Sequence, residues 1–197
     1  MSETATEQRV RPRESPGRPL GAGGRRLAAA FDTVSRLPAL AEARDRLVNL
    51  LRHDSASPGE LAEAVEVDTG LAIAVLQAAN NGAGPRERAG SVVRAIEELS
   101  TGRIAALATA VETYDLLGPP GSGAERYERF RRHALAVRLA AERAGERAQL
   151  EDLDELAAAA LLHDIGRLVL GELYGNEMLM PLGPEESPDE RARRERR

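Results

Sequence analysis

Apolar residues recur at steps of three and four along most of this chain, a spacing that places them on one side of an α-helix. The segments with this spacing are 27–34, 41–52, 61–65, 71–76, 92–99, 101–111, 130–141 and 153–161. Only 3% of the residues are aromatic and none is Trp, so the core must consist of small and aliphatic side chains. Such a core favours closely packed helices over a sheet. The pattern predicts an all-α bundle of about eight helices.

Polar residues at the predicted helix ends support these boundaries. Ser57 opens the run Ser-Pro-Gly-Glu, in which Ser57 caps a helix, Pro lies in its first turn and Glu60 completes a capping box. Asp68, Ser91 and Thr101 are expected to cap the three helices that follow.

The two short helices predicted within residues 57–81 meet at a tight turn, as in DNA-binding helix-turn-helix proteins. A helix that reads DNA needs Arg, Lys, Asn or Gln side chains that reach the base edges. Residues 71–76 are Leu-Ala-Ile-Ala-Val-Leu instead. We therefore expect this second helix to be buried and not to lie in a groove of DNA.

Two histidines and an aspartate follow the helical apolar pattern closely. The stripe of residues 153–161 leads directly into His163 and Asp164, after which Gly166 allows the chain to bend. His133 lies at helical spacing within the segment 130–141, so it too is expected to face the core. Buried imidazole and carboxylate groups are costly unless they find hydrogen bonds, a counter-charge or a metal ion. The residues alone leave open whether these side chains bond to the backbone or bind a metal.

A second His-Asp pair, His53-Asp54, has a different setting. It follows a polar helix end, lacks inward spacing and has no partner histidine upstream. We interpret it as an exposed helix end and a turn, and not as a site.

One inward histidine, followed after a turn and a helix by an inward His-Asp pair, resembles the HD metal-dependent phosphohydrolase superfamily. The sequence LLHDIGRLVL, which contains His163 and Asp164, makes this resemblance more specific. An ordered series of further segments resembles the regulatory HDOD branch of the superfamily. These segments are 37–40, 61–68, 71–81 and 91–96. The resemblance spans roughly residues 36–173.

The resemblance implies a ligand set, and the chain departs from the family pattern at two positions. His133, His163 and Asp164 would be three ligands of a divalent transition metal such as Mn, Fe or Ni, which activates water and polarises a phosphoryl oxygen. The fourth ligand of the superfamily, a distal Asp on a later helix, is not found, and Arg167 stands where active enzymes often have Lys. The resemblance therefore implies a degenerate phosphohydrolase, and no catalytic residue is assigned.

The chain also resembles an HDOD domain that is truncated at its C-terminus, because family members usually continue with more helices. If those helices normally cover the His-Asp helix, their absence is expected to expose Leu168, Val169, Leu170 and Leu173 and to favour association.

Composition along the chain predicts the domain organisation. Residues 1–24 are rich in Arg, Glu, Pro and Gly and are expected to form a disordered N-terminal tail. Residues 25–176 are expected to form the HDOD-like domain, with an N-terminal helical lobe (25–117) and a partial HD-like lobe (124–176) packed together. The break between them is rich in Gly and Pro. Residues 177–197 are expected to form a charged tail.

Charge and residue usage exclude several classes of function. A net charge of -5 argues against a general nucleic-acid binder, for which a basic field supplies most of the affinity. All 27 basic residues are Arg, which excludes a lysine nucleophile, and the absence of Cys excludes a disulfide or a thiolate ligand. The start of the chain is polar, and the apolar run before His163 is far shorter than the roughly 20 residues of a membrane span. We expect a cytoplasmic protein with no membrane association.

Together these features predict a bacterial signalling or regulatory interaction module of the HDOD type, without strong catalysis. Its partner is expected to be another protein or a second copy of the chain. The alternative is an HD-type metal-dependent phosphohydrolase that acts on a nucleotide or cyclic nucleotide. A third hypothesis, a DNA-binding regulator, lacks the basic surface that it needs.

Overall fold

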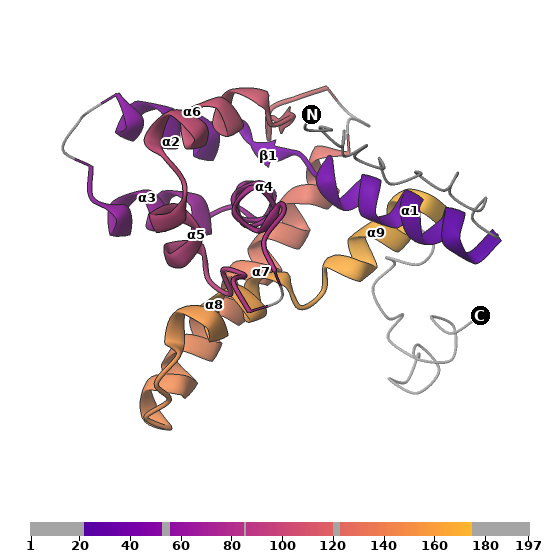
Figure 1. The fold of residues 1–197 in the computed structure, drawn as a ribbon. Helices are drawn as coiled ribbons and strands as arrows, with labels where there is room; N and C mark the ends of the chain where they lie inside the picture. Colours follow the sequence, from indigo (N-terminus) through magenta and orange to yellow (C-terminus); the bar gives the residue numbers. More distant parts are fainter. Residues whose placement is uncertain (1–21, 53–55, 85, 120–122, 175–197) are drawn as a thin grey trace, which may run out of the picture.

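The computed structural model describes residues 22–52, 56–84, 86–119 and 123–174, and it confirms the predicted all-α fold (Figure 1). The elements are α1 (Ala22–Ser35), β1 (Ala39–Leu40), α2 (Ala41–Leu51), α3 (Pro58–Glu66), α4 (Thr69–Asn80), α5 (Val92–Glu98), α6 (Thr101–Ala110), β2 (Thr113–Tyr114), α7 (Ala124–Arg147), α8 (Leu153–Leu162) and α9 (Ile165–Tyr174). Residues 1–21 and 177–197 of the predicted tails, and the pair His53-Asp54, lie outside the described residues. None of the described helices has the length and apolar character that crossing a membrane requires.

Three of the four predicted helix caps are confirmed and one is wrong. The Ser57 side chain accepts from the Glu60 N–H at 3.3 Å, and the Glu60 carboxylate accepts from the Ser57 N–H at 2.8 Å, which completes the capping box. Asp68 and Ser91 cap α4 and α5. In α6 the cap is Ser100 and not Thr101. Ser100 has the extended backbone of a cap, so its hydroxyl reaches an N–H three residues on, whereas Thr101 is already helical.

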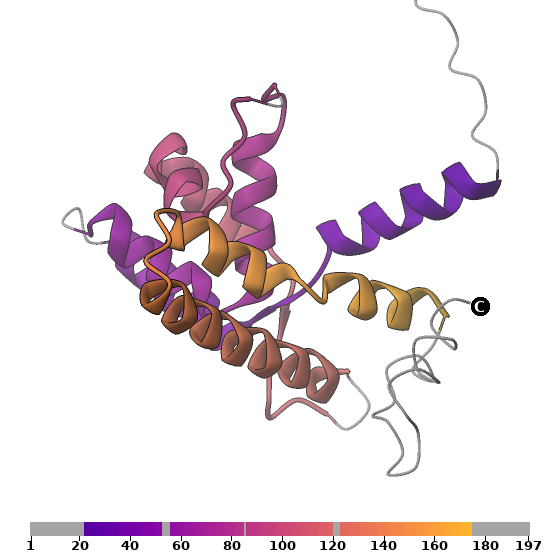
Figure 2. The same ribbon diagram turned by 90° about the horizontal axis from the view of Figure 1, so that it is seen from below.

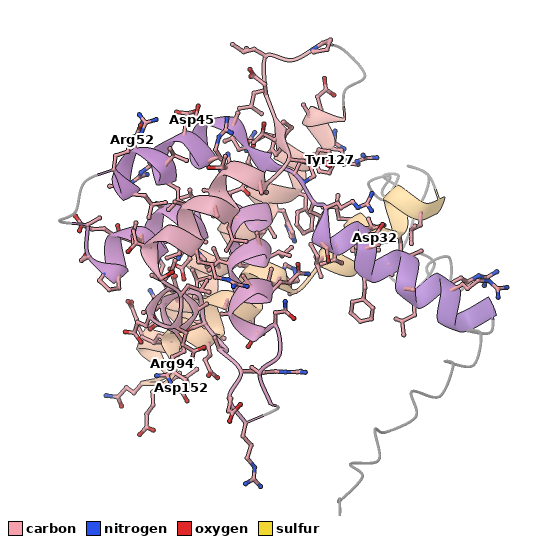
Figure 3. The ribbon with its side chains drawn as sticks, turned by 45° about the horizontal axis from the view of Figure 1, so that its top comes forward. Asp32, Asp45, Arg52, Arg94, Tyr127 and Asp152 are labelled. Atoms are coloured by element: carbon pink, nitrogen blue, oxygen red, sulfur yellow. The ribbon has the colours of Figure 1, made fainter. Side chains whose placement is uncertain are left out.

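Helix α4 runs through the middle of the N-terminal part and contacts α3, α5, α6 and β1 (Figure 1). Its side chains Leu71, Ala72, Ile73, Val75 and Leu76 are all buried, as the sequence predicts. This helix therefore forms the core and cannot lie in a DNA groove. At the periphery, Figure 3 shows the charged side chains of Asp45, on α2, and Arg52, just after α2, projecting outward.

Two short strands were not predicted. β1 and β2 pair in parallel, with Ala39 opposite Thr113 and Leu40 opposite Tyr114. Strands of two residues carry no detectable alternation of apolar and polar positions, so the periodicity could not reveal them. The pairing joins the connection after α1 to the connection after α6.

Helices α7 and α8 form an antiparallel hairpin that extends from the body (Figures 1 and 2). Gly145 allows their close approach, since a Cβ atom there would lie 2.6 Å from Leu153 Cδ2 and 2.8 Å from Leu156 Cδ2. The hairpin sets the relative position of the residues near the start of α7 and the end of α8.

The expected exposure of Leu168 and Val169 is wrong, because these side chains are only 3% and 4% exposed. Helix α1 lies alongside α9 and covers this face, as Figure 2 shows. Leu168 is buried in a cluster with Leu37 and Ile73. Leu173, near the end of α9, stays exposed.

Arg138 of α7 connects the two predicted lobes. Its Nη1 lies 3.0 Å from the Glu66 carboxylate of α3 and 2.6 Å from the Glu142 carboxylate. Burial raises the pKa of Glu66 above its ordinary value, although the positive charge of Arg138 offsets part of this effect.

Replacing Glu66 with Gln should remove part of the pH dependence of stability. Burial raises the pKa of Glu66 in the folded chain. At a pH just above the ordinary pKa of a glutamate, the folded chain therefore still holds a proton that the unfolded chain has released. Stability therefore falls as the pH rises through this window and recovers as the pH falls. The urea midpoint should rise between neutral pH and about pH 5 in the wild type, and less so in Glu66→Gln. Glu42→Gln, an exposed change on α2, should behave like the wild type; equal shifts in all three proteins would refute the assignment.

Candidate metal centre

The three predicted ligands meet at one point, where the end of α8 reaches α7. His133 lies on α7, His163 follows the last residue of α8, and Asp164 lies in the break before α9. These residues form the only cluster with metal-ligating side chains among the described residues. The structure thus brings the three residues together, and their role as metal ligands stays a prediction.

The spacing of the three donor atoms suits a single ion. His133 Nε2 lies 3.3 Å from His163 Nε2 and 3.5 Å from Asp164 Oδ2, and His163 Nε2 lies 3.8 Å from Asp164 Oδ2. Bonds of about 2.0–2.2 Å to one tetrahedral ion would separate its ligand atoms by about 3.4 Å. The residues present thus fit three positions around one transition-metal ion.

The orientation of the His163 ring is fixed by its other nitrogen. Nδ1 lies 2.7 Å from the backbone carbonyl oxygen of Ala160, which can only accept a hydrogen bond. Nδ1 therefore carries the proton, and Nε2 presents a lone pair to His133 and Asp164. A histidine that ligates a metal is usually held by such a bond.

The predicted inward orientation of the histidines is wrong. The side chains of His133 and His163 are 50% and 36% exposed, and Asp164 is half-buried. On α7 the buried stripe passes through Ala134, which turns the preceding His133 to the rim. Helix α8 ends at Leu162, so His163 no longer follows the stripe that buries Leu161.

Arg167 makes a contact with the site that the sequence analysis did not predict. Its Nη1 donates to Asp164 Oδ2 at 3.0 Å, and this is the same oxygen that faces both histidines. Asp164 and Arg167 are three residues apart at the start of a helix, and this spacing could have predicted their ion pair. The guanidinium places a fixed positive charge beside the position that a metal ion would occupy.

Arg131, two residues before His133, holds α7 in place. Its guanidinium forms two hydrogen bonds to Glu128, at 2.7 and 2.8 Å, and a third to the backbone carbonyl of Val67 at 3.1 Å. The hydrogen bonds from Arg131 hold the pKa of the Glu128 carboxyl below its ordinary value. Tyr114 donates to Glu128 at 3.4 Å, and burial raises the pKa of this phenol. These contacts tie the helix of His133 to the N-terminal part.

Comparison with known proteins finds solved structures with a similar fold and a domain family that matches this chain. Two structures of the MmoQ response regulator from Methylococcus capsulatus str. Bath share its fold at 23% identity. One match covers 68% of this chain and 53% of the other with a TM-score of 0.57, and the second covers 80% and 62% with a TM-score of 0.58. This chain thus spans less than two thirds of either chain. No protein with a curated description matches. The HDOD domain matches residues 37–195, and the chain therefore belongs to the HDOD domain family.

Proposed function

We propose that this chain is a cytoplasmic regulatory module that acts by binding another protein, or a second copy of itself, and not by hydrolysis. The observation that carries the proposal is the contact between Arg167 and Asp164 Oδ2 at 3.0 Å. Membership of the HDOD family and the likeness to proteins described as response regulators support it.

The electrostatics of the cluster favour a protein-binding role for this chain over a catalytic one. A divalent ion between His133, His163 and Asp164 would lie close to the positive charge of Arg167, which opposes its binding. No fourth metal-ligating side chain joins the cluster within the part of the chain that the structure describes. Both histidines are exposed, so water reaches the site freely and screens the charges that an enzyme would use.

The alternative function is a metal-dependent phosphohydrolase that acts on a nucleotide or cyclic nucleotide. The spacing of 3.3–3.8 Å between donor atoms and the fixed ring of His163 favour this alternative. His133, His163 and Asp164 would hold the ion, which when bound lowers the pKa of water and polarises a phosphoryl oxygen. Mn, Fe and Ni are the ions to test.

A hydrolysis assay separates the two functions. Bis-p-nitrophenyl phosphate and a cyclic dinucleotide would be incubated with the wild type, His163→Ala and His53→Ala, each with and without Mn²⁺. His53 is the remaining histidine of the chain and serves as the matched control. The regulatory proposal expects no Mn²⁺-dependent turnover above the level of His163→Ala. Turnover that persists in His53→Ala and disappears in His163→Ala would instead establish the phosphohydrolase.

Removing the charge of Arg167 should strengthen metal binding. Arg167→Ala is expected to tighten Mn²⁺ binding about tenfold, because the repulsion beside Asp164 is lost, with the size reduced by solvent screening. Calorimetric titration with Mn²⁺ measures the change. Arg167→Lys keeps the positive charge and should bind Mn²⁺ much like the wild type. If Arg167→Ala binds no more tightly than Arg167→Lys, the guanidinium does not oppose the ion.

A further inference from the structure

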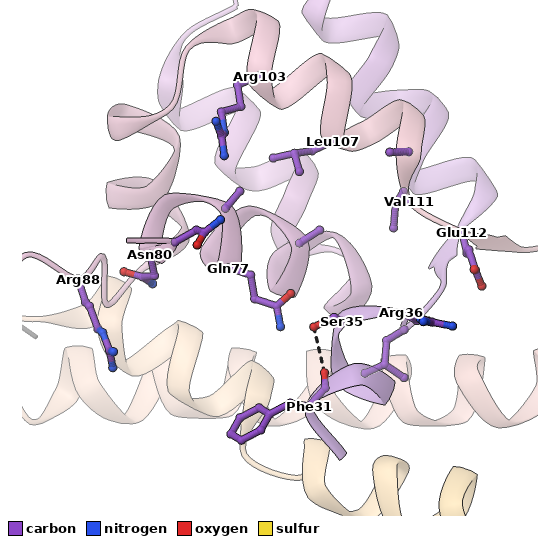
Figure 4. Close-up of a pocket in the computed structure, with 15 residues that line it drawn as sticks. Phe31, Ser35, Arg36, Gln77, Asn80, Arg88, Arg103, Leu107, Val111 and Glu112 are labelled. Carbon is purple, nitrogen blue, oxygen red and sulfur yellow. Dashed lines mark hydrogen bonds between the residues drawn. The ribbon is translucent and has the colours of Figure 1, made fainter. Parts of the chain in front are cut away.

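A separate groove lies between α1, α4 and α6, with a volume of about 770 Å³ (Figure 4). None of the three candidate metal ligands lines it. Its volume falls within the range of sites that bind small molecules. Small side chains of α4 and α6, namely Ala74, Ala78 and Ala110, leave the space open, and Leu107 and Val111 supply an apolar wall.

Three arginines from separate elements line this groove. Arg36 follows α1, Arg88 lies in the connection between α4 and α5, and Arg103 lies on α6. Among the described residues of the lining, Glu112 is the one acid. Arg36 is already paired with Asp32 at 3.1 Å. The guanidinium groups of Arg88 and Arg103 form no ion pair or hydrogen bond with another described residue. A positive surplus on a chain with a net charge of -5 points to an anionic ligand.

The connection that carries Arg88 is held in place. The side-chain oxygen of Asn80 accepts from the Ala89 N–H at 2.8 Å, and its amide nitrogen donates to the Ala89 carbonyl at 3.1 Å. The backbone beside Arg88 is therefore fixed before a ligand arrives, which lowers the entropy cost of binding. Arg88 also borders a neighbouring acidic groove, so Arg103 is the better test of the anion site.

The groove also offers an exposed aromatic ring. Phe31 is 63% exposed on α1, although it is one of only two Phe residues in the chain. Figure 4 shows its ring at the edge of the groove, one turn before Ser35, whose hydroxyl donates to the Phe31 carbonyl at 2.9 Å. Gln77 projects from α4 toward α1 in the same view and provides an exposed amide. A ring and an amide beside arginines can bind a planar, hydrogen-bonding group that carries a phosphate.

We propose that this groove binds a nucleoside phosphate, with the phosphate at Arg103 and the base stacked on Phe31. Gln77 would form hydrogen bonds to the base or the sugar. Arginine binds phosphate with paired hydrogen bonds, and stacking on an aromatic ring is available to every base. This site goes beyond the proposed function, since it uses neither histidine and does not depend on a metal.

Calorimetric titration with AMP, adenosine and inorganic phosphate tests the proposal. AMP should bind the wild type more tightly than adenosine or phosphate does. Arg103→Ala should weaken AMP binding about tenfold or more, because a charge-assisted contact is lost. Phe31→Ala should weaken AMP binding about fivefold to tenfold and leave phosphate binding unchanged.

Two control variants test whether AMP binds in this groove. Arg46→Ala removes an exposed arginine of α2 outside the groove and should leave AMP binding unchanged. His163→Ala should also leave it unchanged, which distinguishes this groove from the candidate metal centre. Absence of binding at millimolar AMP, equal binding by Arg103→Ala and the wild type, or loss of binding in His163→Ala would each overturn the proposal.

Discussion

Replacing Gly70 with alanine should lower the free energy of unfolding by about 2 kcal/mol, although the same change in most helices is stabilising. A Cβ atom at Gly70 would lie 2.8 Å from the carbonyl oxygen of Pro38, 2.9 Å from its carbonyl carbon and 3.1 Å from the Ala39 nitrogen. All three are backbone atoms, so no side chain can rotate to make room. Helix α4 or strand β1 would have to move, and β1 is paired with β2.

Gly102→Ala provides the matched control. Gly102 lies in α6, and a Cβ atom there would meet nothing within 4 Å. This change should stabilise the chain by up to about 1 kcal/mol through the higher helix propensity of alanine. Urea unfolding, followed by the helical circular dichroism signal, compares the two variants. Equal effects of Gly70→Ala and Gly102→Ala would show that the contact with Pro38 does not limit α4.

Asp68→Ala should cost about 3 kcal/mol of unfolding free energy, as the sum of a lost cap and a buried N–H left without its partner. Asp68 is only 1% exposed. Its Oδ1 accepts from the Leu71 N–H and its Oδ2 from the Leu40 N–H, both at 3.0 Å. One carboxylate therefore caps α4 and also fixes the start of α2, 28 residues earlier. Burial raises the pKa of Asp68, and these hydrogen bonds oppose that shift.

Two further variants separate the contribution of the helix cap from that of the bond to the Leu40 N–H. Asp68→Asn keeps the shape and one accepting oxygen, so it should fall between the wild type and Asp68→Ala. Ser100→Ala removes an exposed cap with a single bond and should cost about 1 kcal/mol. The midpoints of urea unfolding give the order. If Asp68→Ala costs no more than Ser100→Ala, the bond to the Leu40 N–H contributes nothing.

The local features of the fold could be predicted from the sequence. The capping box at Ser57 and the buried helix after Asp68 depend on residues within one or two turns, and the structure confirms both. The cluster of His133, His163 and Asp164 was predicted through the family resemblance, because helical spacing alone does not show which helices meet. The structure brings their donor atoms within 3.8 Å of one another.

The remaining features depend on contacts between distant segments. The burial of Leu168 requires α1 to lie on α9, and no pattern within either helix specifies that neighbour. His133 is exposed because the buried side of α7 passes through the next residue, Ala134. A shift of one position along the helix therefore decides whether the histidine faces the core or the solvent. Helical periodicity locates the apolar side of a helix only approximately, so residues at its border can be assigned to the wrong side.

The packing of α1 on α9 also bears on the order in which the chain folds. Helices α7 and α8 are joined by a short turn, so their contact closes a small loop, whereas α1 and α9 lie at opposite ends of the described chain. Closing a longer loop costs more chain entropy, and contacts of high sequence separation form slowly. We expect the hairpin to bring His133 and His163 together early in folding. The segment after Asp164 would then be covered only when α1 docks.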